Sequence, residues 1–392
     1  MTPHTLRAWW AARQGLLAPS PEQDPATVLA RTGWARSVGG VGPYLTLFAR
    51  AGTARAAADA AVAALEIHEL PSARGCTYVV PRADFALALR VGQGAGEASE
   101  VATAKKHLGV TDAELERLCD RVLGALAAGP LDPAALKDSL GEAVRNLGPE
   151  GKKRGVTTTL PLALGKLQAL GEIRRVPVGG RLDQQRYAYA RWIDSPLKHA
   201  GLPLAEAHVE LARRYFRWIG PATAAQFQAF AGLGVKASKA ALAPLGLVPV
   251  LADSPLLIHP DDLDALRAFT PPAEPVHRLV AGVDGLVLLR RDLAAHLDPA
   301  DAARIGAGNG LQDLPSHAIV DRGRVVGLWE YDPADAAITW SSFVPPTAAL
   351  RAEIARTEAM IRDQLGDARA DSLDSLERRR PRIAALRAQA AV

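Results

Sequence analysis

Apolar residues recur at the spacing of helices through the middle of the chain. Between residues 111 and 171 the apolar positions lie three or four residues apart, which places one apolar face on each helix. The first helix begins at Thr111, because Thr111 and Glu114 have the spacing of a capping box. Its apolar face is formed by Leu115, Leu118, Val122 and Leu126. The pair Gly129 and Pro130 ends it.

Two further helices and a hairpin follow. The segment LDPAALKDSLG predicts a short helix that begins at Asp132, with Pro133 in its first turn. After a predicted loop, GPEGKKRGV, a third helix begins beyond three threonines and ends at Gly171. Its apolar positions are Leu160, Leu164, Leu167 and Leu170. The period then changes to two, so EIRRVPV and RYAYARW predict strands joined by the turn GGRLDQQ. Three helices followed by a hairpin is the order of a winged helix, in which the third helix enters the major groove.

The remaining segments are shorter and more mixed. Before residue 111 the pattern predicts short helices and one strand at CTYVVP. Between residues 196 and 270 it predicts a helix that ends at Gly220, a second opened by Pro221, a third from about Val235, and strand-like GLVPVLADSPLLIH. From Val276 the period is mostly two, so HRLVAGVDGLVLLRRD, SHAIVDRGRVVGLWEYD and AITWSSFVP predict strands. A hairpin turn is predicted at Asp321, Arg322 and Gly323, and another at Asp332 and Pro333. A helix over 348–365 then precedes a charged tail with ERRRPR, which we expect to be solvated.

These elements predict an α+β fold made of tandem winged-helix, or helix-turn-helix, units and a C-terminal β-rich domain. The predicted domains are an N-terminal winged-helix-like domain (1–110), a basic winged-helix domain (111–195), a third winged-helix-like domain (196–270), a β-rich domain (271–345), and a C-terminal helix with a charged tail (346–392).

Charge is concentrated in one of these domains. The net charge of the 392 residues is +4. Residues 145–191 hold ten basic and three acidic residues, a net +7, which leaves −3 for the rest of the chain. A local basic patch of this kind indicates a polyanionic partner, and we predict double-stranded DNA. The alternative is a solvated basic face on a structural winged helix.

The predicted DNA contacts lie at the start of the third helix and along the hairpin. Backbone amides and the helix dipole favour a phosphate at a helix N-terminus, where the KKR loop and the threonine hydroxyls would lie. The predicted DNA-binding residues are Lys152, Lys153, Arg154, Thr157, Thr158, Thr159, Lys166, Arg174, Arg175, Arg181 and Arg186.

Other classes of site lack a sequence signal. The two cysteines, Cys76 and Cys119, have no CxxC or Cys/His spacing, which excludes a disulfide scaffold and a standard zinc module. The nine histidines form no HxxxH or HExxH pair, so we expect no metal and no cofactor. There is no apolar run of membrane-spanning length and no dimer helix with heptads. We therefore expect a cytoplasmic, nucleoid-associated monomer that does not bind membranes.

Several stretches, in this order along the chain, resemble one family. They are LPSARGCTYVVPRAD, LGKLQALGEIRRV, ARRYFRWIGPATAAQFQAFAGL, and GVDGLVLLRRD with VDRGRVVGLWEYD. The chain resembles the winged-helix DNA-binding proteins that include the bacterial interstrand-crosslink-repair DNA glycosylases. The resemblance implies tandem winged helices arranged around duplex DNA, with a β-rich domain closing one side. It also implies excision of bulky N7-alkylated purines, including crosslinked ones.

The sequence departs from this family at the expected catalytic motif. Members carry Gln-x-Gln or Gln-x-Asp near the N-terminus to hold the water that attacks the sugar carbon. The equivalent stretch, GWARSVGGVGPYLTLFAR, places Arg36, Ser37 and Val38 at the motif, or residues closer to Tyr44 if the match slides. Neither glutamine is present in either register.

Other groups in the sequence offer acid–base chemistry. Hydrolysis of an N-glycosidic bond needs a positioned water and stabilisation of an oxocarbenium-like sugar, normally from a carboxylate or carboxamide. Hydroxyls of Ser37 and Tyr44 can bind water, and EIHELPSARGC adds carboxylates beside a histidine. The candidate catalytic residues are Ser37, Tyr44, Glu66, His68 and Glu69. The alternative for the EIHE cluster is an ordinary surface pair.

Three functions are compatible with these observations. The first is a DNA-repair protein for alkylated or crosslinked DNA, either a divergent glycosylase or a damage-binding protein without excision. The second is a winged-helix transcription regulator. The third is a protein-interaction module whose basic patch binds an acidic partner. Salt dependence separates the third from the others, because phosphate binding weakens steeply as salt rises.

Overall fold

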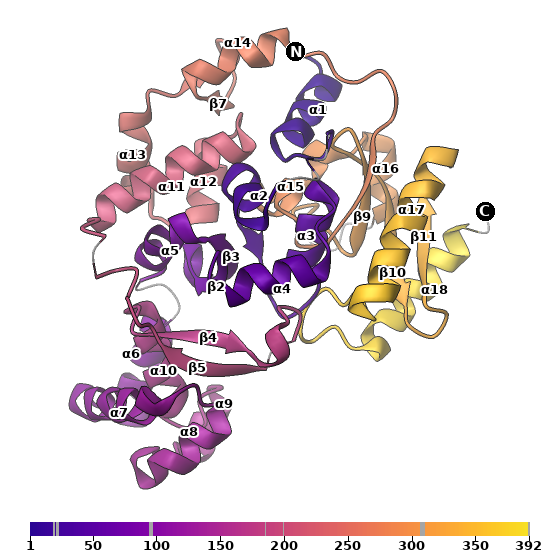
Figure 1. Cartoon of the computed structure of the whole chain (residues 1–392). Coiled ribbons are helices and arrows are strands. Elements are labelled where there is room, and N and C mark those ends of the chain that lie inside the picture. The colour runs from indigo at the N-terminus through magenta and orange to yellow at the C-terminus, as the bar shows by residue number, and fades with distance from the viewer. Residues whose placement is uncertain are drawn as a thin grey trace.

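The computed structural model describes residues 1–18, 20, 23–93, 97–184, 186–198, 200–305 and 310–390. Helices and small antiparallel sheets alternate along the chain, which confirms the α+β class (Figure 1). None of the described helices has the length and apolar composition needed to cross a membrane.

The N-terminal part packs helices around a three-stranded antiparallel sheet of order β1-β3-β2. Its elements are α1 (Pro3–Arg13), α2 (Pro25–Thr32), β1 (Ala35–Arg36), α3 (Gly42–Ala51), α4 (Arg55–Ala63), β2 (Ile67–Pro71), β3 (Thr77–Pro81) and α5 (Phe85–Gly92). The predicted strand CTYVVP is therefore confirmed as β3. Strand β1 is short and follows directly on Trp34, whose buried ring packs against Trp218, 5.3 Å between ring centroids.

The basic segment forms a helical unit that carries a two-stranded hairpin. Its elements are α6 (Glu97–Leu108), α7 (Asp112–Ala125), α8 (Pro133–Leu140), α9 (Gly148–Lys153), α10 (Leu160–Ala169), β4 (Ile173–Pro177) and β5 (Tyr187–Arg191). The predicted capping box is present, because Thr111 and Glu114 exchange hydrogen bonds, and Asp132 caps α8. The order of helices and hairpin agrees with the sequence prediction.

Two details of this unit differ from the prediction. The predicted loop GPEGKKRGV contains the short helix α9, because Pro149 suits a first helical turn and Glu150 pairs with Arg154 one turn later, at 2.7 Å. Leu170 was predicted to be apolar core, but it follows the last turn of α10 and is 46% exposed. The other predicted leucines of α7 and α10 are buried in one apolar cluster, whose buried members all lie between residues 104 and 173.

The next segment packs on the N-terminal part. Its elements are α11 (Leu204–Ile219), α12 (Ala224–Ala231), α13 (Val235–Leu242), β6 (Val248–Pro249), β7 (Leu257–Ile258) and α14 (Pro260–Ala268). Helix α11 ends at Gly220 and α13 begins at Val235, as predicted. Helix α12 begins three residues after Pro221, because Thr223 and Gln226 form a capping box there. Helix α14 was not predicted.

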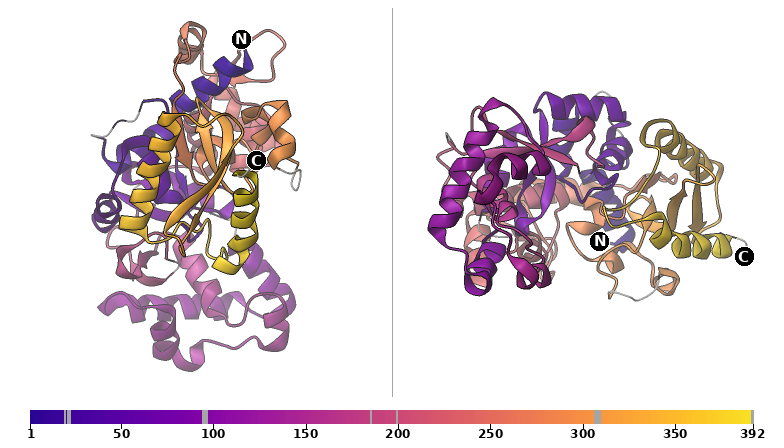
Figure 2. Two further views of the ribbon diagram at one scale, coloured as in Figure 1. Left: turned by 90° about the vertical axis from the view of Figure 1, so that its right-hand side faces the viewer. Right: turned by 90° about the horizontal axis from the view of Figure 1, so that it is seen from below.

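The C-terminal part is a four-stranded antiparallel sheet of order β11-β10-β9-β8 with helices on both sides. Its elements are β8 (His277–Val280), α15 (Gly285–Leu288), α16 (Pro299–Ile305), β9 (His317–Asp321), β10 (Arg324–Asp332), β11 (Ala337–Ser342), α17 (Ala348–Met360) with a π-helical end (Ile361–Leu365), and α18 (Leu376–Ala390). Figure 2 shows α17 and α18 flanking the strands. The turn at Arg322 and Gly323 is confirmed, with φ of 47° and 80°.

Two predictions for this part were wrong. HRLVAGVDGLVLLRRD was predicted as a strand, and its first four residues form β8, but its second half contains the short helix α15, because Asp284 accepts a hydrogen bond from the Leu286 backbone and caps the helix. The tail with ERRRPR was expected to be solvated, but it forms α18, which packs on the sheet and buries Ile383 and Leu386. Its charged side chains pair with acidic residues elsewhere: Arg379 is 2% exposed and bonded to Asp367.

The hairpin region and the C-terminal part are in direct contact. In Figure 1 the helices α6 to α10 form the lower end of the molecule, and β4 and β5 lie between them and the N-terminal sheet. The connection between β4 and β5 reaches the C-terminal part, because Arg181 donates to the Leu365 carbonyl at 2.9 Å. Arg369 returns a hydrogen bond to the Asp183 carbonyl at 2.6 Å.

Candidate active site

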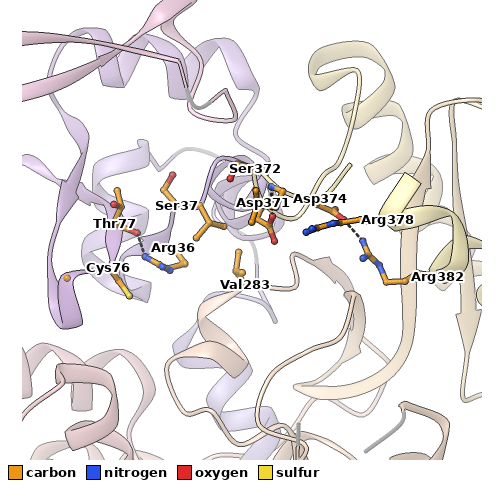
Figure 3. A pocket seen from close by; sticks show the side chains of 13 residues that line it. Arg36, Ser37, Cys76, Thr77, Val283, Asp371, Ser372, Asp374, Arg378 and Arg382 are labelled. Carbon is orange, nitrogen blue, oxygen red and sulfur yellow. Dashed lines mark hydrogen bonds and ion pairs between the residues drawn. The ribbon is translucent and has the colours of Figure 1, made fainter. Parts of the chain in front are cut away.

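An open cavity of about 680 Å³ lies between the N-terminal part and the C-terminal part of the chain. One wall is formed by residues 36–38, at the end of β1, and by residues 75–77, at the start of β3. The other is formed by residues 371–374, which connect the π-helical end of α17 to α18, and by Arg378 and Arg382 of α18 (Figure 3). Val283 completes the lining.

Backbone hydrogen bonds and a glycine hold the two walls together. The Ser372 amide donates to the Val38 carbonyl at 3.0 Å, and the Val41 amide donates to the Arg369 carbonyl at 3.0 Å. Gly40 allows this approach, because a Cβ at its position would collide with the Ala370 carbonyl oxygen. The glycine-rich sequence after Ser37 is therefore what admits the C-terminal loop to the cavity.

Ser37 lies in the cavity wall, but its hydroxyl is used internally. The backbone amide of Ser37 donates to the Thr77 carbonyl at 3.0 Å, and the hydroxyl donates to the Glu69 carboxylate. Both side chains are buried. In Figure 3 the Ser37 oxygen points away from Asp371. The structure thus brings together two of the predicted catalytic residues, on the side of Ser37 that faces the interior.

Glu69 is a buried acid that contacts the hairpin as well as Ser37. Burial raises the pKa of Glu69, and the hydroxyl of Ser37 and the positive charge of Arg175 partly oppose that rise. Tyr187 of β5 lies next to the same carboxylate, and the pKa of this tyrosine is raised by burial and by Glu69. Glu69 therefore couples the N-terminal sheet to the hairpin.

Like Glu69, the other three predicted catalytic residues lie outside the cavity lining. Tyr44 is buried in α3, donates its hydroxyl to Asp59 and accepts the Leu182 amide at 2.9 Å. Burial and Asp59 raise the pKa of Tyr44, so it is a weaker acid than usual. Glu66 is exposed and lines a different cavity, near Arg82.

His68 lies in an apolar environment within the N-terminal sheet. Its ring packs 5.6 Å from Trp192 and 6.1 Å from Phe85, measured between ring centroids. Burial lowers the pKa of His68 to about 3, so the ring is neutral at physiological pH. Because His68 and Glu69 are consecutive residues of a strand, their side chains point to opposite faces of the sheet.

The charged groups that face the cavity come mainly from residues that the sequence pattern does not single out. Asp371 is half-buried, and in Figure 3 its carboxylate points into the space between Arg36 and Arg378. Arg36 is held in the wall, because it donates to the Thr77 carbonyl at 2.9 Å and stacks on Tyr78. Asp374, the second carboxylate of the lining, is buried and paired with Arg382 at 2.6 Å.

Asp371 could not have been found from the sequence. It lies in a linker without hydrophobic periodicity, just before the tail that was expected to be solvated, and beyond the stretches that carry the family resemblance. Only the long-range contacts of the linker with residues 38–41 bring this carboxylate to the cavity.

The predicted DNA contacts at the start of α10 differ in accessibility. Lys152, Lys153 and Arg154 are exposed on and just after α9, and Glu150 pairs with Arg154 at 2.7 Å and with Lys153 at 3.6 Å. The three threonines are not equivalent: Thr157 is exposed, Thr158 is half-buried and Thr159 is buried. The Thr159 hydroxyl accepts the Arg145 backbone amide at 3.1 Å, so it is part of the local structure.

The predicted contacts on the hairpin are partly engaged with aromatic rings. The guanidinium of Arg174 lies 5.7 Å from the Trp192 ring, and that of Arg175 lies 5.2 Å from the Tyr187 ring. Arg186 is exposed and lines an open cavity of about 620 Å³ with Tyr187, Tyr189 and Arg175. Lys166 is half-buried in the last turn of α10.

Arg181 is engaged differently from the other hairpin arginines. It pairs with Asp183 and holds the hairpin connection to the C-terminal part.

Among the described residues, no three His, Cys, Asp or Glu side chains are placed to hold a metal ion together. Cys76 is half-buried and lines the cavity at residues 36–38, whereas Cys119 is buried in the core of the helical unit. Burial raises the pKa of the Cys119 thiol.

A family model and a solved structure both match this chain. The profile of the family described as "DNA glycosylase AlkZ-like" matches residues 41–366. The solved structure of Streptomyces sahachiroi DNA glycosylase AlkZ matches with a TM-score of 0.69 and 19% identity, over 95% of this chain and 98% of that chain. No curated protein matches. The structural match shows a shared fold, and the profile confirms the family resemblance found in the sequence. The matched span begins after Val38 and ends before Asp371.

Proposed function

The chain belongs to the AlkZ-like DNA glycosylase family, and from this premise we propose that it is a DNA-repair protein that binds alkylated or crosslinked duplex DNA and excises N7-alkylpurines. The observation that carries the proposal is the cavity lined by residues 36–38. The family resemblance assigns the water-holding motif to these residues, and the cavity gives an extruded base and sugar a place to bind.

The basic unit would provide the duplex contact. We interpret α7, α8 and α10 with the hairpin β4–β5 as a winged helix, and the units 1–110 and 196–270 as winged-helix-like. The exposed cations of α9 and Arg186 are the side chains best suited to contact phosphates. The protein would act as a monomer on cytoplasmic, nucleoid-associated DNA.

The chemistry required of the cavity is modest. Alkylation at N7 makes the purine cationic, so it departs from C1′ as a neutral base and needs little help as a leaving group. The sugar becomes oxocarbenium-like and must be attacked by water. Arg36 and Arg378 suit the phosphates beside the lesion, whereas activation of water requires a carboxylate, an amide or another base.

A non-catalytic damage-binding protein, or a winged-helix transcription regulator, is the alternative. Two observations favour it. Both glutamines are absent from the expected motif, and the Ser37 hydroxyl already donates its hydrogen to the Glu69 carboxylate. Either function would keep the duplex contact of the basic unit and lack release of a base.

A single-turnover assay separates these functions. Excess protein is incubated with duplex DNA that contains N7-methylguanine, and separately with an N7-linked interstrand crosslink, followed by alkali to cleave abasic sites. We expect strand cleavage above the spontaneous rate of base loss. Tight binding without abasic product would instead support the non-catalytic alternative. A DNA affinity that does not change with salt would contradict the proposed contact between the basic unit and the phosphates of the duplex.

A further inference from the structure

We propose that Asp371 is the general base that activates the attacking water in this protein. The inference rests on the proposed excision of N7-alkylpurines and adds to it a residue from the opposite end of the chain. It assigns to a C-terminal loop the function that the resemblance expects from the N-terminal motif.

Asp371 lies in the wall of the cavity. Its side chain lines the same cavity as Ser37 and Val38, and it is half-buried rather than enclosed. One carboxylate oxygen, Oδ1, accepts the Leu373 backbone amide at 2.7 Å, which fixes the orientation of the group. In Figure 3 the carboxylate faces the open space of the cavity.

The neighbouring acids are already engaged in hydrogen bonds or ion pairs. Asp374 also lines the cavity, but it is buried, accepts the Ala370 amide at 2.9 Å and pairs with Arg382 at 2.6 Å. Glu69 lies behind Ser37, is buried and is bonded to that hydroxyl. Within the described part of the chain, Asp371 is the one cavity-lining carboxylate that is in no ion pair. It is therefore the acid that remains available to a water molecule.

Hydrogen bonds hold the loop that carries Asp371 in place, and a general base must be held within hydrogen-bond reach of the water. The Ser372 amide bonds to the Val38 carbonyl at 3.0 Å, and the Val41 amide bonds to the Arg369 carbonyl at 3.0 Å. Within the loop, the Asp374 carboxylate accepts a hydrogen bond from the Ala370 amide. The backbone on both sides of Asp371 is thus attached to the segment that carries Ser37.

The reaction step balances without a metal or a cofactor as reactant. A lone pair of the water oxygen forms the bond to C1′, and a water proton passes to the Asp371 carboxylate. The C1′–N9 bond breaks, and its electron pair neutralises the cationic purine as it leaves. The products are an abasic sugar and the alkylated base, and the protonated Asp371 then releases its proton to solvent.

The test compares D371N with wild type and with the matched control D363N in the single-turnover assay on N7-methylguanine duplex. Asp363 is an exposed acid of the π-helical end that pairs with Arg362 and does not line the cavity, so D363N makes the same chemical change outside the site. We expect D371N to slow excision by about 10²-fold or more, with duplex affinity and melting temperature unchanged, and D363N to remain near wild type.

A second measurement distinguishes a general base from a structural role. Removal of the side chain in D371A opens space for a small carboxylate, so added formate should restore part of the rate to D371A and leave the rate of D363N unchanged. Excision by D371N within about threefold of wild type would overturn the inference and leave the proposed function intact. Absence of excision by the wild-type protein, with binding retained, would overturn both.

Discussion

At the scale of single residues, the bond between Ser37 and Glu69 determines what the N-terminal motif can do. A hydroxyl that donates to a buried carboxylate has no hydrogen left for a water in the cavity, and its remaining lone pairs can only accept. Ser37 is therefore better suited to hold Glu69 in place than to activate water. Glu69 in turn lies beside Arg175 and Tyr187 of the hairpin, so this carboxylate affects how the basic unit is attached.

The buried Glu69 should make the stability of the protein depend on pH. Its pKa is raised by burial in the folded state, whereas in the unfolded chain it returns to about 4.3. The folded state then binds more protons, so the free energy of unfolding falls as pH rises from about 4.3 through the raised pKa. Glu69→Gln removes this ionisation and keeps the shape of the side chain. The melting temperature of the variant, relative to that of wild type, should therefore increase as pH rises from about 5 to about 8.

The control for this experiment is Glu66→Gln, because Glu66 is exposed and only three residues away. Its melting curve should run parallel to that of wild type across the same pH range. Parallel curves for Glu69→Gln as well would mean that Glu69 contributes nothing to the pH dependence of folding.

At the scale of elements, α9 is the part of the basic unit most suited to phosphates. Lys152, Lys153 and Arg154 are all exposed, and Glu150 is the acid paired with two of them. The triple variant K152A/K153A/R154A should weaken binding to damaged and undamaged duplexes alike, on the order of tenfold at low salt. The slope of log affinity against log salt should flatten by about 0.9 for each phosphate that the variant no longer neutralises, which a titration by fluorescence anisotropy measures.

A matched control is available on another short helix. Lys236 and Lys239 are exposed on α13, outside the basic unit, so K236A/K239A removes positive charge without touching α9. This double variant should keep the wild-type salt slope. An unchanged affinity in the triple variant would remove α9 from the duplex contact.

The elements that the sequence predicted well are those whose signals are local. Helix α7 has a capping box and a regular apolar face. The spacing of apolar residues changes between α10 and the strands β4 and β5. All of these elements could therefore be found from neighbouring residues alone. Helix α9 was missed because it is six residues long and contains two glycines. Helix α18 was missed because charged residues dominate its first half and its arginines find their acidic partners in distant segments, as Arg382 does with Glu330.

At the scale of the whole molecule, the candidate site is assembled from both ends of the chain. Local pattern and family resemblance led to Ser37 and Glu69, but the opposite wall depends on contacts that no periodicity encodes. His317 of β9 is one of them: its Nδ1 accepts the Gly282 amide at 3.0 Å and its Nε2 donates to the Ala368 carbonyl at 2.8 Å. The ring therefore joins the strand end near Val283 to the loop that carries Asp371.

A buried ion pair makes the same connection between the N-terminal and C-terminal parts. Arg50 of α3 donates two hydrogen bonds, at 2.8 and 2.9 Å, to Asp284 at the start of α15, and both side chains are 1% exposed. Arg50 also donates to Gln14 after α1 at 2.9 Å. Three segments distant in sequence thus share one charge network in the interior.

Breaking this network should destabilise the protein far more than breaking a surface pair. Arg50→Met removes the cation and leaves Asp284 buried without its partner, which costs about 3–5 kcal/mol. Arg267→Met breaks the exposed pair with Asp264 and should cost less than about 1 kcal/mol. Urea unfolding followed by circular dichroism measures both. Because Asp284 lies next to Val283 in the cavity wall, Arg50→Met should also slow excision at temperatures where it remains folded. Equal stability of the two variants would mean that the buried pair of Arg50 and Asp284 contributes no more to stability than an exposed pair does.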